Sequence, residues 1–308
     1  MNIHHLRYFI ALAKRSNYRE AASFCNVSQP AISMAIKTME EKLGGNLISR
    51  HKTPIKLTPF GETVFVHALN IVNEYEHMMS YQDSDGSLGG EINLGIIPTV
   101  ASALIPLFIT PLLADYPNIK LNIHEITTSG IIDMIYKDEL DAGLVATPIE
   151  HLKLHNHVLY YEEFMVYSSN DIDKDYILPS DIEIEDLWLL EEGHCLRSQI
   201  LNLCELKASK NGPISYNAGS IETLLNLVDG HGGITIVPEL TVSQMTKSRK
   251  KRLSLFTPPA PVREISLISH KFSHKKKQIE AIINTIDRMI PSYMKDKEDH
   301  MNPPITLV

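Results

Sequence analysis

The sequence predicts a chain of two parts, a small all-α N-terminal domain with a long helix after it and a larger C-terminal α/β domain. Three observations support this prediction. Residues 1–60 show helical hydrophobic spacing interrupted by short turns, residues 83–90 form a small, polar, glycine-rich run, and strand-like and helix-like segments alternate beyond that run. With 308 residues, 44% of them hydrophobic, the chain is long and apolar enough to bury the cores that this organisation requires.

The N-terminal domain is expected to consist of short helices. The apolar positions of residues 1–15 recur at helical spacing and no small-residue cleavage site follows them, so we interpret this segment as a mature helix and not as a signal peptide. Ser16 or Asn17 is expected to cap a second helix over residues 18–25. Ser28 is expected to cap a third helix, with Pro30 in its first turn and Gly44-Gly45 at its end.

The two faces of the third helix differ in composition. One face is an apolar stripe typical of a buried helix side, formed by Ile32, Ala35, Ile36, Met39 and Leu43. The other face is mostly small, polar or basic, which suits a helix that enters a DNA major groove and offers donors to bases and phosphates. That second face consists of Gln29, Ser33, Met34, Lys37 and Thr38.

Charge separates the two parts of the chain. Residues 1–60 carry nine Lys and Arg against three acids, whereas the whole chain carries −8, which leaves −14 on the remainder. A basic head on an acidic body favours nucleic-acid contact through the head only. Small domains also vary in charge by chance, so the charge alone does not decide whether the N-terminal domain binds nucleic acid. Residues 46–57, with Arg50, predict a basic hairpin beside the DNA backbone.

The helix that begins near residue 58 has apolar residues at heptad spacing, namely Phe65, Ala68, Val72, Tyr75 and Met79. Such spacing is typical of helices that pair, and two paired copies would hold two DNA-reading heads at a fixed separation. An amphipathic helix packed on its own domain has the same spacing, and two heptads do not distinguish the two arrangements.

Beyond residue 90, the alternation of segments predicts parallel sheets with helices on their faces. No apolar run approaches the length needed to cross a membrane, and the residues from about Lys295 are expected to be frayed. The expected strands are 92–97, 121–126, 142–146, 158–167, 188–190, 214–217, 234–237 and 265–268. The expected helices are 100–114, 131–136, 221–228 and 279–290, with 195–208 a helix or a loop.

Residues 1–62 resemble the winged helix-turn-helix of LysR-type transcriptional regulators. The matching residues are Leu6 to Phe9, Ala21-Ala22, Val27 to Ser33, Ile36, Glu40, Leu43-Gly44, Leu47, Arg50, Leu57-Thr58 and Gly61. The resemblance implies an effector domain of two α/β subdomains joined by crossover strands, similar to periplasmic binding proteins. It implies three kinds of partner. These are double-stranded DNA with a pseudo-palindromic operator, RNA polymerase, and further copies of the chain in a dimer or tetramer. The residues expected on DNA are Ser28, Gln29, Ser33, Lys37 and Arg50.

A more specific resemblance is to the OxyR group of hydrogen-peroxide sensors within this family. It rests on Glu192 to Arg197 followed by Cys204, on Gly95 to Val100 and on Ser220 to Leu224. It implies that Cys195 is the peroxidatic cysteine and Cys204 the resolving one, with Thr99, Thr128, His194, Arg197 and Arg263 near the peroxide pocket. Two positions depart from the group, Ser215 where a histidine can stand and His270 where an arginine can stand.

The chemistry of such a sensor requires a thiolate, which attacks one peroxide oxygen and becomes a sulfenic acid. We expect His194, Arg197 and a helix N-terminus at Cys195 to lower the pKa of its thiol. If residues 195–204 form one α-helix, nine residues rise about 13.5 Å, whereas a disulfide needs Cα atoms within about 7 Å. Closing the bond would then require the segment to unwind, which would couple oxidation to a change of shape.

These observations predict a regulator with DNA-binding residues 1–60, a linker helix and hinge at 61–90, a regulatory domain at 91–295 and a tail at 296–308. Three cysteines and no export signal favour the reducing cytoplasm. We expect no enzyme activity, cofactor or metal site, because His4, His5 and His124 lack metal-ligand spacing. The alternatives are a regulator that binds a small metabolite between the subdomains, a thiol peroxidase with a DNA-binding head, and a structural nucleoid-binding protein.

Overall fold

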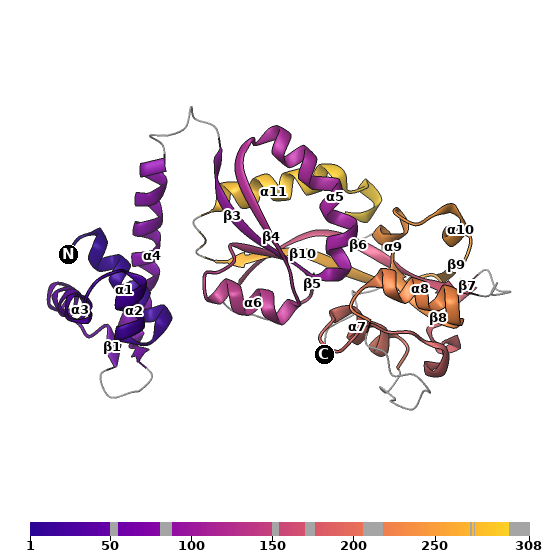
Figure 1. The fold of residues 1–308 in the computed structure, drawn as a ribbon, viewed down its shortest axis with the longest axis horizontal. Helices are drawn as coiled ribbons and strands as arrows, with labels where there is room; N and C mark the ends of the chain where they lie inside the picture. Colours follow the sequence, from indigo (N-terminus) through magenta and orange to yellow (C-terminus); the bar gives the residue numbers. More distant parts are fainter. Residues whose placement is uncertain are drawn as a thin grey trace. The chain divides into compact units, whose positions relative to one another are not determined.

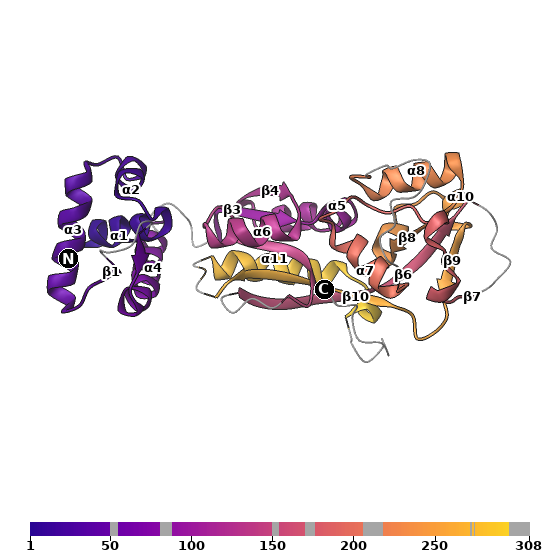
Figure 2. The same cartoon turned by 90° about the horizontal axis from the view of Figure 1, so that it is seen from below.

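The computed structural model describes residues 1–49, 55–80, 88–149, 154–169, 176–205, 218–271, 273 and 275–295. The chain divides into two compact units, one built from Met1–Ser87 and the other from Leu88–Lys271 and Lys275–Val308. Figures 1 and 2 show the elements of both units.

The first unit is a helical domain with a short hairpin. Asn17 caps the second helix by accepting from the amides of Arg19 and Glu20, whereas Ser16 ends the first helix in a left-handed conformation. Ser28 occupies the N-cap position of the third helix, but the expectation that its side chain caps the helix is wrong, because that side chain makes no cap hydrogen bond. The elements are α1 (Ile3–Arg15), α2 (Tyr18–Phe24), α3 (Gln29–Leu43), β1 (Ile48–Ser49), β2 (Lys56–Leu57) and α4 (Pro59–Ser80).

The apolar stripe of α3 lies in the core of this unit as expected, apart from Leu43, which is exposed. The hairpin is antiparallel, with Ile48 opposite Leu57. It is fixed to α3 by the buried carboxylate of Glu40, which accepts from the amides of Leu47 at 2.8 Å and Ile48 at 3.5 Å. A Cβ at Gly61 would clash with the carbonyl oxygen of Leu47, so α4 passes this close to the hairpin only with glycine there.

The heptad stripe of α4 packs within its own unit. Ala68 and Val72 are buried in the core of the unit. Phe65 meets Phe9 edge to face at 6.3 Å, and the guanidinium of Arg7 lies 5.8 Å from the ring of Tyr75. Ala68 and Val72 thus pack within their own unit, as in the second of the two arrangements left open by the sequence. The side chain of Met79 lies outside the described residues.

The second unit contains a mixed sheet in the order β4-β3-β5-β10-β6-β9-β7, with β8 paired to β6. The expectation of parallel sheets is only partly right. β3 is parallel to β4 and β5, but β10 is antiparallel to β5 and β6, and β8 and β9 are antiparallel to β6. The strands are β3 (Gly89–Ile96), β4 (Asn118–Glu125), β5 (Ala142–Thr147), β6 (Leu154–Ser168), β7 (Tyr176–Ile177), β8 (Ile234–Pro238), β9 (Leu253–Phe256) and β10 (Val262–His270).

The antiparallel pairing has a topological cause. β6 pairs with β10 along its first part and with β8 and β9 from Phe164 onward, so it runs from one subdomain into the other. β10 returns in the opposite direction. Each subdomain has its own apolar core, one around Leu94, Phe108 and Ile282 and the other around Val166, Leu224 and Ile236. This is the expected pair of α/β subdomains joined by crossover strands.

Helices cover both subdomains. In the first subdomain, α5 and α11 lie on one side of the sheet and α6 on the other (Figure 1). The expected strand at 188–190 is wrong, since this segment makes only isolated bridges from Leu187 to Ile234 and from Leu190 to Ala218. The expected strand at 214–217 lies outside the described residues. The helices are α5 (Pro98–Asp115), α6 (Thr128–Tyr136), α7 (Cys195–Leu203), α8 (Ile221–His231), α9 (Glu239–Val242), α10 (Lys247–Lys250) and α11 (Lys276–Met289).

α5 corrects one expectation from the sequence. Its 18 residues are long and apolar enough, by length and composition, to span a membrane, although no run of that length was expected. Val100, Leu104, Phe108 and Leu112 of this helix are buried in the core of the first subdomain. The apolar character of α5 is therefore accounted for by packing against the sheet and α11.

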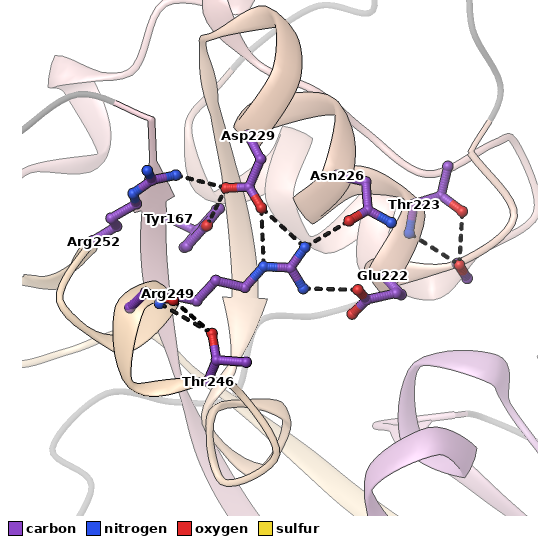
Figure 3. A network of polar contacts seen from close by, with 10 residues as sticks. Tyr167, Glu222, Thr223, Asn226, Asp229, Thr246, Arg249 and Arg252 are labelled. Atoms are coloured by element: carbon purple, nitrogen blue, oxygen red, sulfur yellow. Dashed lines mark hydrogen bonds and ion pairs between the residues drawn. The ribbon is translucent and has the colours of Figure 1, made fainter.

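A cluster of charged side chains fixes α10 to α8 in the second subdomain (Figure 3). Arg249 bonds Glu222 at 2.7 Å, Asn226 at 2.6 Å and Asp229 at 3.0 Å, three residues on one stripe of α8. Asp229 also accepts from Arg252. The basic run 247–252 is thus partly neutralised by the helix beside it.

Candidate functional site

The Cys195 thiol lies where the N-termini of two helices of the second unit, α6 and α7, meet. Cys195 is the first residue of α7, directly after the N-cap residue His194. Its Sγ is 2.6 Å from the hydroxyl Oγ1 of Thr128, the first residue of α6. The side chain packs against the core of the first subdomain and is only partly exposed. Two helix N-termini therefore converge on one sulfur atom, and both favour negative charge there.

Burial raises the pKa of the Cys195 thiol above its ordinary value, because desolvation disfavours the thiolate. The hydrogen bond from Thr128, the positive charge of Arg263 and the backbone amides of Cys195 and Thr128 act in the opposite direction without offsetting burial. The expectation of a lowered pKa is therefore wrong. Burial of the sulfur is the largest influence on this thiol.

The cation that acts on Cys195 is Arg263, not the two residues beside it in sequence. Arg197 donates to the carbonyl oxygen of Leu190 at 2.9 Å. His194 is buried, with its Nε2 3.6 Å from a carboxylate oxygen of Glu191. Both side chains are held within the loop that precedes α7.

Arg263 is buried and fixed by four contacts. Its Nε and one terminal nitrogen each lie 2.8 Å from Oε1 of Glu162. The other terminal nitrogen donates to the hydroxyl of Thr99 at 3.0 Å, and the first also donates to the Thr99 carbonyl oxygen at 3.2 Å. The predicted pocket residues Thr99 and Arg263 thus contact each other, and Thr128 contacts Cys195.

Glu162 is the residue of this cluster that the sequence prediction missed. It is fully buried in β6, directly opposite Arg263 in the strand register. An acid at an interior position of the apolar segment 158–167 was the available signal, since a buried carboxylate requires a partner of opposite charge. His270 ends β10 opposite Leu154, and Ser215 lies outside the described residues.

Cys204 lies in the other subdomain core. It is the C-cap residue of α7, is buried, and belongs to the cluster around Val166 and Leu224. Burial raises its pKa to about 11. Because residues 195–203 are helical, the two cysteines are separated by about 13.5 Å along the helix axis. Both are free thiols in this structure.

The predicted DNA-facing side of α3 is exposed in the first unit. Ser28, Gln29, Ser33 and Lys37 are all exposed, and the last three recur every fourth residue on one face. Lys37 is 3.8 Å from Glu41, an ion pair open to solvent. Met34, on the same side, is 71% exposed. Arg50 lies outside the described residues.

No metal-binding cluster of three or more His, Cys, Asp or Glu side chains occurs among the described residues. The chemistry that the Cys195 surroundings support is nucleophilic attack by sulfur, with Thr128 as a hydrogen-bond donor and Arg263 as a fixed cation.

Comparison with known proteins places both units. A family model described as bacterial regulatory helix-turn-helix protein, lysR family, matches residues 3–62, and the LysR substrate binding domain matches residues 85–290. The chain is 29% identical over 303 residues to a hydrogen peroxide-inducible genes activator of Pectobacterium carotovorum, covering 96% of this chain and 99% of that protein.

Two solved structures have the same fold. A cysteine-to-aspartate variant of full-length OxyR from Pseudomonas aeruginosa matches with a TM-score of 0.67 and 26% identity, covering 94% of this chain and 99% of that one. A cysteine-to-serine mutant of Corynebacterium glutamicum OxyR, H2O2-bound, matches with a TM-score of 0.60 and 27% identity, covering 94% and 92%. The chain belongs to the LysR family of bacterial transcriptional regulators, has a fold of the OxyR type, and is a regulator and not an enzyme.

Proposed function

We propose that this regulator responds to hydrogen peroxide by oxidation of Cys195. The observation that carries the proposal is the contact of Cys195 Sγ with Thr128 at 2.6 Å, at the N-terminus of α7 and within the field of Arg263. The Cys195 thiolate would attack one peroxide oxygen, forming an S–O bond as the O–O bond breaks. Hydroxide leaves with the bonding electron pair, and sulfenic acid remains on sulfur.

The second step of the proposal is a disulfide between Cys195 and Cys204. The Cys204 thiolate would attack the sulfenic sulfur, forming the S–S bond and releasing hydroxide, which takes up a proton to give water. Because α7 holds the two sulfurs in different cores, the helix would have to unwind for this bond to form. His194 and Arg197, which anchor the loop before α7, are proposed as pocket residues that move with it.

DNA recognition is proposed for the exposed face of α3. Gln29, Ser33 and Lys37 would lie in the major groove of a pseudo-palindromic operator, with Ser28 beside them and Arg50 expected on the wing. The exposure of the first four side chains supports this assignment. Transcriptional control would then follow from contact with RNA polymerase at the promoter.

Assembly into a dimer or tetramer is proposed through α4, with a stripe different from the one first expected. Ile71 and Met78 are seven residues apart and are 51% and 59% exposed. Exposed apolar side chains at that spacing suit pairing of two α4 helices. We further propose that residues 1–60 bind DNA, that residues 61–90 form the linker, that residues 91–295 form the regulatory domain and that residues 296–308 form a tail. The proposed compartment is the cytoplasm, because thiols stay reduced there.

The test is thiol mapping by mass spectrometry before and after a brief, low dose of hydrogen peroxide. We expect a rapid Cys195–Cys204 linkage in the wild-type protein and none in Cys195→Ser, with Cys25 as an internal reference thiol. Cys195 and Cys204 that stay reduced while Cys25 oxidises would contradict the peroxide function. A response that persists in Cys195→Ser would point instead to a small metabolite bound between the subdomains.

A further inference from the structure

The cation that influences Cys195 already has an anionic partner. Glu162 and Arg263 face each other across β6 and β10, at the point where both strands cross between the subdomains. Both side chains are about 1% exposed, and their charged atoms are 2.8 Å apart. Two opposite unit charges this close largely cancel each other's field at a third site. The field of Arg263 at the sulfur is therefore set in part by Glu162.

Glu162 is bound as an ionised carboxylate. Its Oε1 accepts from two nitrogens of Arg263, and its Oε2 accepts from the amide of Leu240 at 3.0 Å. Every one of these contacts is a donor pointing at the carboxylate, which fits a group that carries no proton of its own. Burial, helped by the negative charge of Glu239, raises the pKa of Glu162 above its ordinary value, and Arg263 and the Leu240 amide oppose that rise without cancelling it.

Three other ionisable groups of the described residues lie near the pair or the thiol. Tyr160 is fully buried on β6, and burial holds its pKa well above the ordinary value, so it stays neutral. Glu239, at the start of α9, acts on Glu162 as a second negative charge. Near the thiol, the nitrogen of His194 faces Glu191. The anion in direct contact with Arg263 is the Glu162 carboxylate, and the Cys195 thiolate, when it forms, is a second anion within its field.

We propose that Glu162 is a positioning residue that restrains the reactivity of Cys195, by competing with its thiolate for the charge of Arg263. The inference rests on the proposed function, because it concerns the same sulfur atom. It goes beyond that function in assigning the restraint to a residue that belongs to neither the thiol pair nor the predicted pocket. The sensor's threshold is then set by an ion pair in the crossover strands.

Removing the charge of Glu162 should make Cys195 more reactive, which a purely structural role of Glu162 does not predict. In Glu162→Gln the amide keeps the length and an acceptor oxygen but loses the charge, so the charge of the buried guanidinium is no longer balanced by its ion-pair partner and acts more strongly on the Cys195 thiolate. The pKa of Cys195 should fall, with about tenfold faster alkylation at neutral pH. If Glu162 has only a structural role, alkylation of Cys195 in Glu162→Gln should be slower than in the wild type or unchanged.

The experiment measures iodoacetamide alkylation of the full-length protein between pH 6 and 10, with peptide mass spectrometry following Cys195 and Cys25 separately. Glu163→Gln, at the next position of β6, is the matched control and should leave the Cys195 profile unchanged. The Glu162→Gln effect must vanish in the Arg263→Met background, because it acts through Arg263. If Glu162→Gln fails to fold, Glu162→Asp gives the sign, since withdrawing the charge by one methylene should produce a smaller acceleration.

An unchanged or slower alkylation of Cys195 in a folded Glu162→Gln protein would overturn the proposal, and so would an effect that persists without Arg263. The readout needs no peroxide, disulfide or DNA. Failure of hydrogen peroxide to oxidise wild-type Cys195 would therefore reject the proposed function and leave the Glu162 result to be judged by itself.

Discussion

The Thr128 hydroxyl and the Cys195 sulfur lie 2.6 Å apart and join the N-termini of α6 and α7. A hydroxyl that donates to a thiolate stabilises the charged form by about 1.5–3 kcal/mol. We predict that Thr128→Val raises the pKa of Cys195 further and slows its alkylation at pH 8 by about tenfold. Thr128→Ser keeps the donor and should react like the wild type. Equal rates in Thr128→Val and Thr128→Ser would show that the hydroxyl does not act on the sulfur.

Cys204 should make stability depend on alkaline pH. Burial raises its pKa from 9.0 to about 11 in the folded protein, so the folded state holds the proton that the unfolded chain releases. Its contribution is complete below about pH 9 and is lost as the pH rises through 11. In urea unfolding under reducing conditions, the stability difference between wild type and Cys204→Ala should shrink by about 1.4 kcal/mol per pH unit over this interval. A difference independent of pH would be the contrary result.

Glu40 should be essential for the hairpin of the first unit. Its buried carboxylate accepts from the amides of Leu47 and Ile48, and Glu40→Ala would leave both amides without that acceptor. We predict a loss of about 1–3 kcal/mol in the free energy of unfolding, read from the thermal transition of the DNA-binding unit. Glu41→Ala, which removes only an exposed ion pair with Lys37, serves as the control and should change stability by less than about 0.5 kcal/mol.

Arg249 and Arg252 should differ in their effect on the second subdomain. Arg249 is 17% exposed and bonds three residues of α8, whereas Arg252 is 41% exposed and bonds Asp229 of that helix. Arg249→Ala is predicted to lower stability by about 1–3 kcal/mol and Arg252→Ala by less than about 1 kcal/mol. Differential scanning calorimetry distinguishes the two, and equal melting temperatures would mean that the Arg249 contacts contribute nothing measurable.

Lys37 should contribute to DNA affinity without contributing to sequence preference. If it meets a phosphate, Lys37→Ala weakens binding to operator and random DNA alike and reduces the slope of log affinity against log salt by about one. Fluorescence anisotropy at several salt concentrations measures this slope. Lys120→Ala, an exposed lysine of the second unit paired with Glu91, should leave the slope unchanged. A loss confined to the operator would assign Lys37 to a base instead.

The helical pattern of the first unit was predictable because local rules govern it. Helical spacing, Asn17, Pro30 and the glycines after Leu43 are short-range signals that the structure follows. Leu43 and the heptad stripe of α4 were harder, because which of several apolar residues is covered depends on α1, which is distant in sequence. The exposed Ile71 and Met78 follow from that packing and from no local pattern.

The direction of the β10 strand and the role of Glu162 required the fold. Periodicity identifies a strand but not its direction, and the antiparallel pairing of β10 follows from its return between subdomains. For Cys195, sequence neighbours suggested His194 and Arg197 as activating cations, yet helix geometry turns Arg197 toward Leu190. Arg263, 68 positions later, is the cation that acts, and burial outweighs it. Electrostatic interactions between residues this far apart in the sequence cannot be predicted from the residues next to Cys195.

The place of β10 in the sheet has a consequence for biosynthesis. β10 lies between β5 and β6, so the sheet of the first subdomain is complete only after residues 262–270 have been synthesised and inserted. As the nascent chain leaves the ribosome from its N-terminus, β6, β8 and β9 can pair before that closure. Cys204 can thus enter its core before Arg263 takes its place in the sheet. Until β10 is inserted, Glu162 has no counter-ion and remains in contact with water. The electrostatic surroundings of Cys195 are therefore complete only when this last strand joins the sheet.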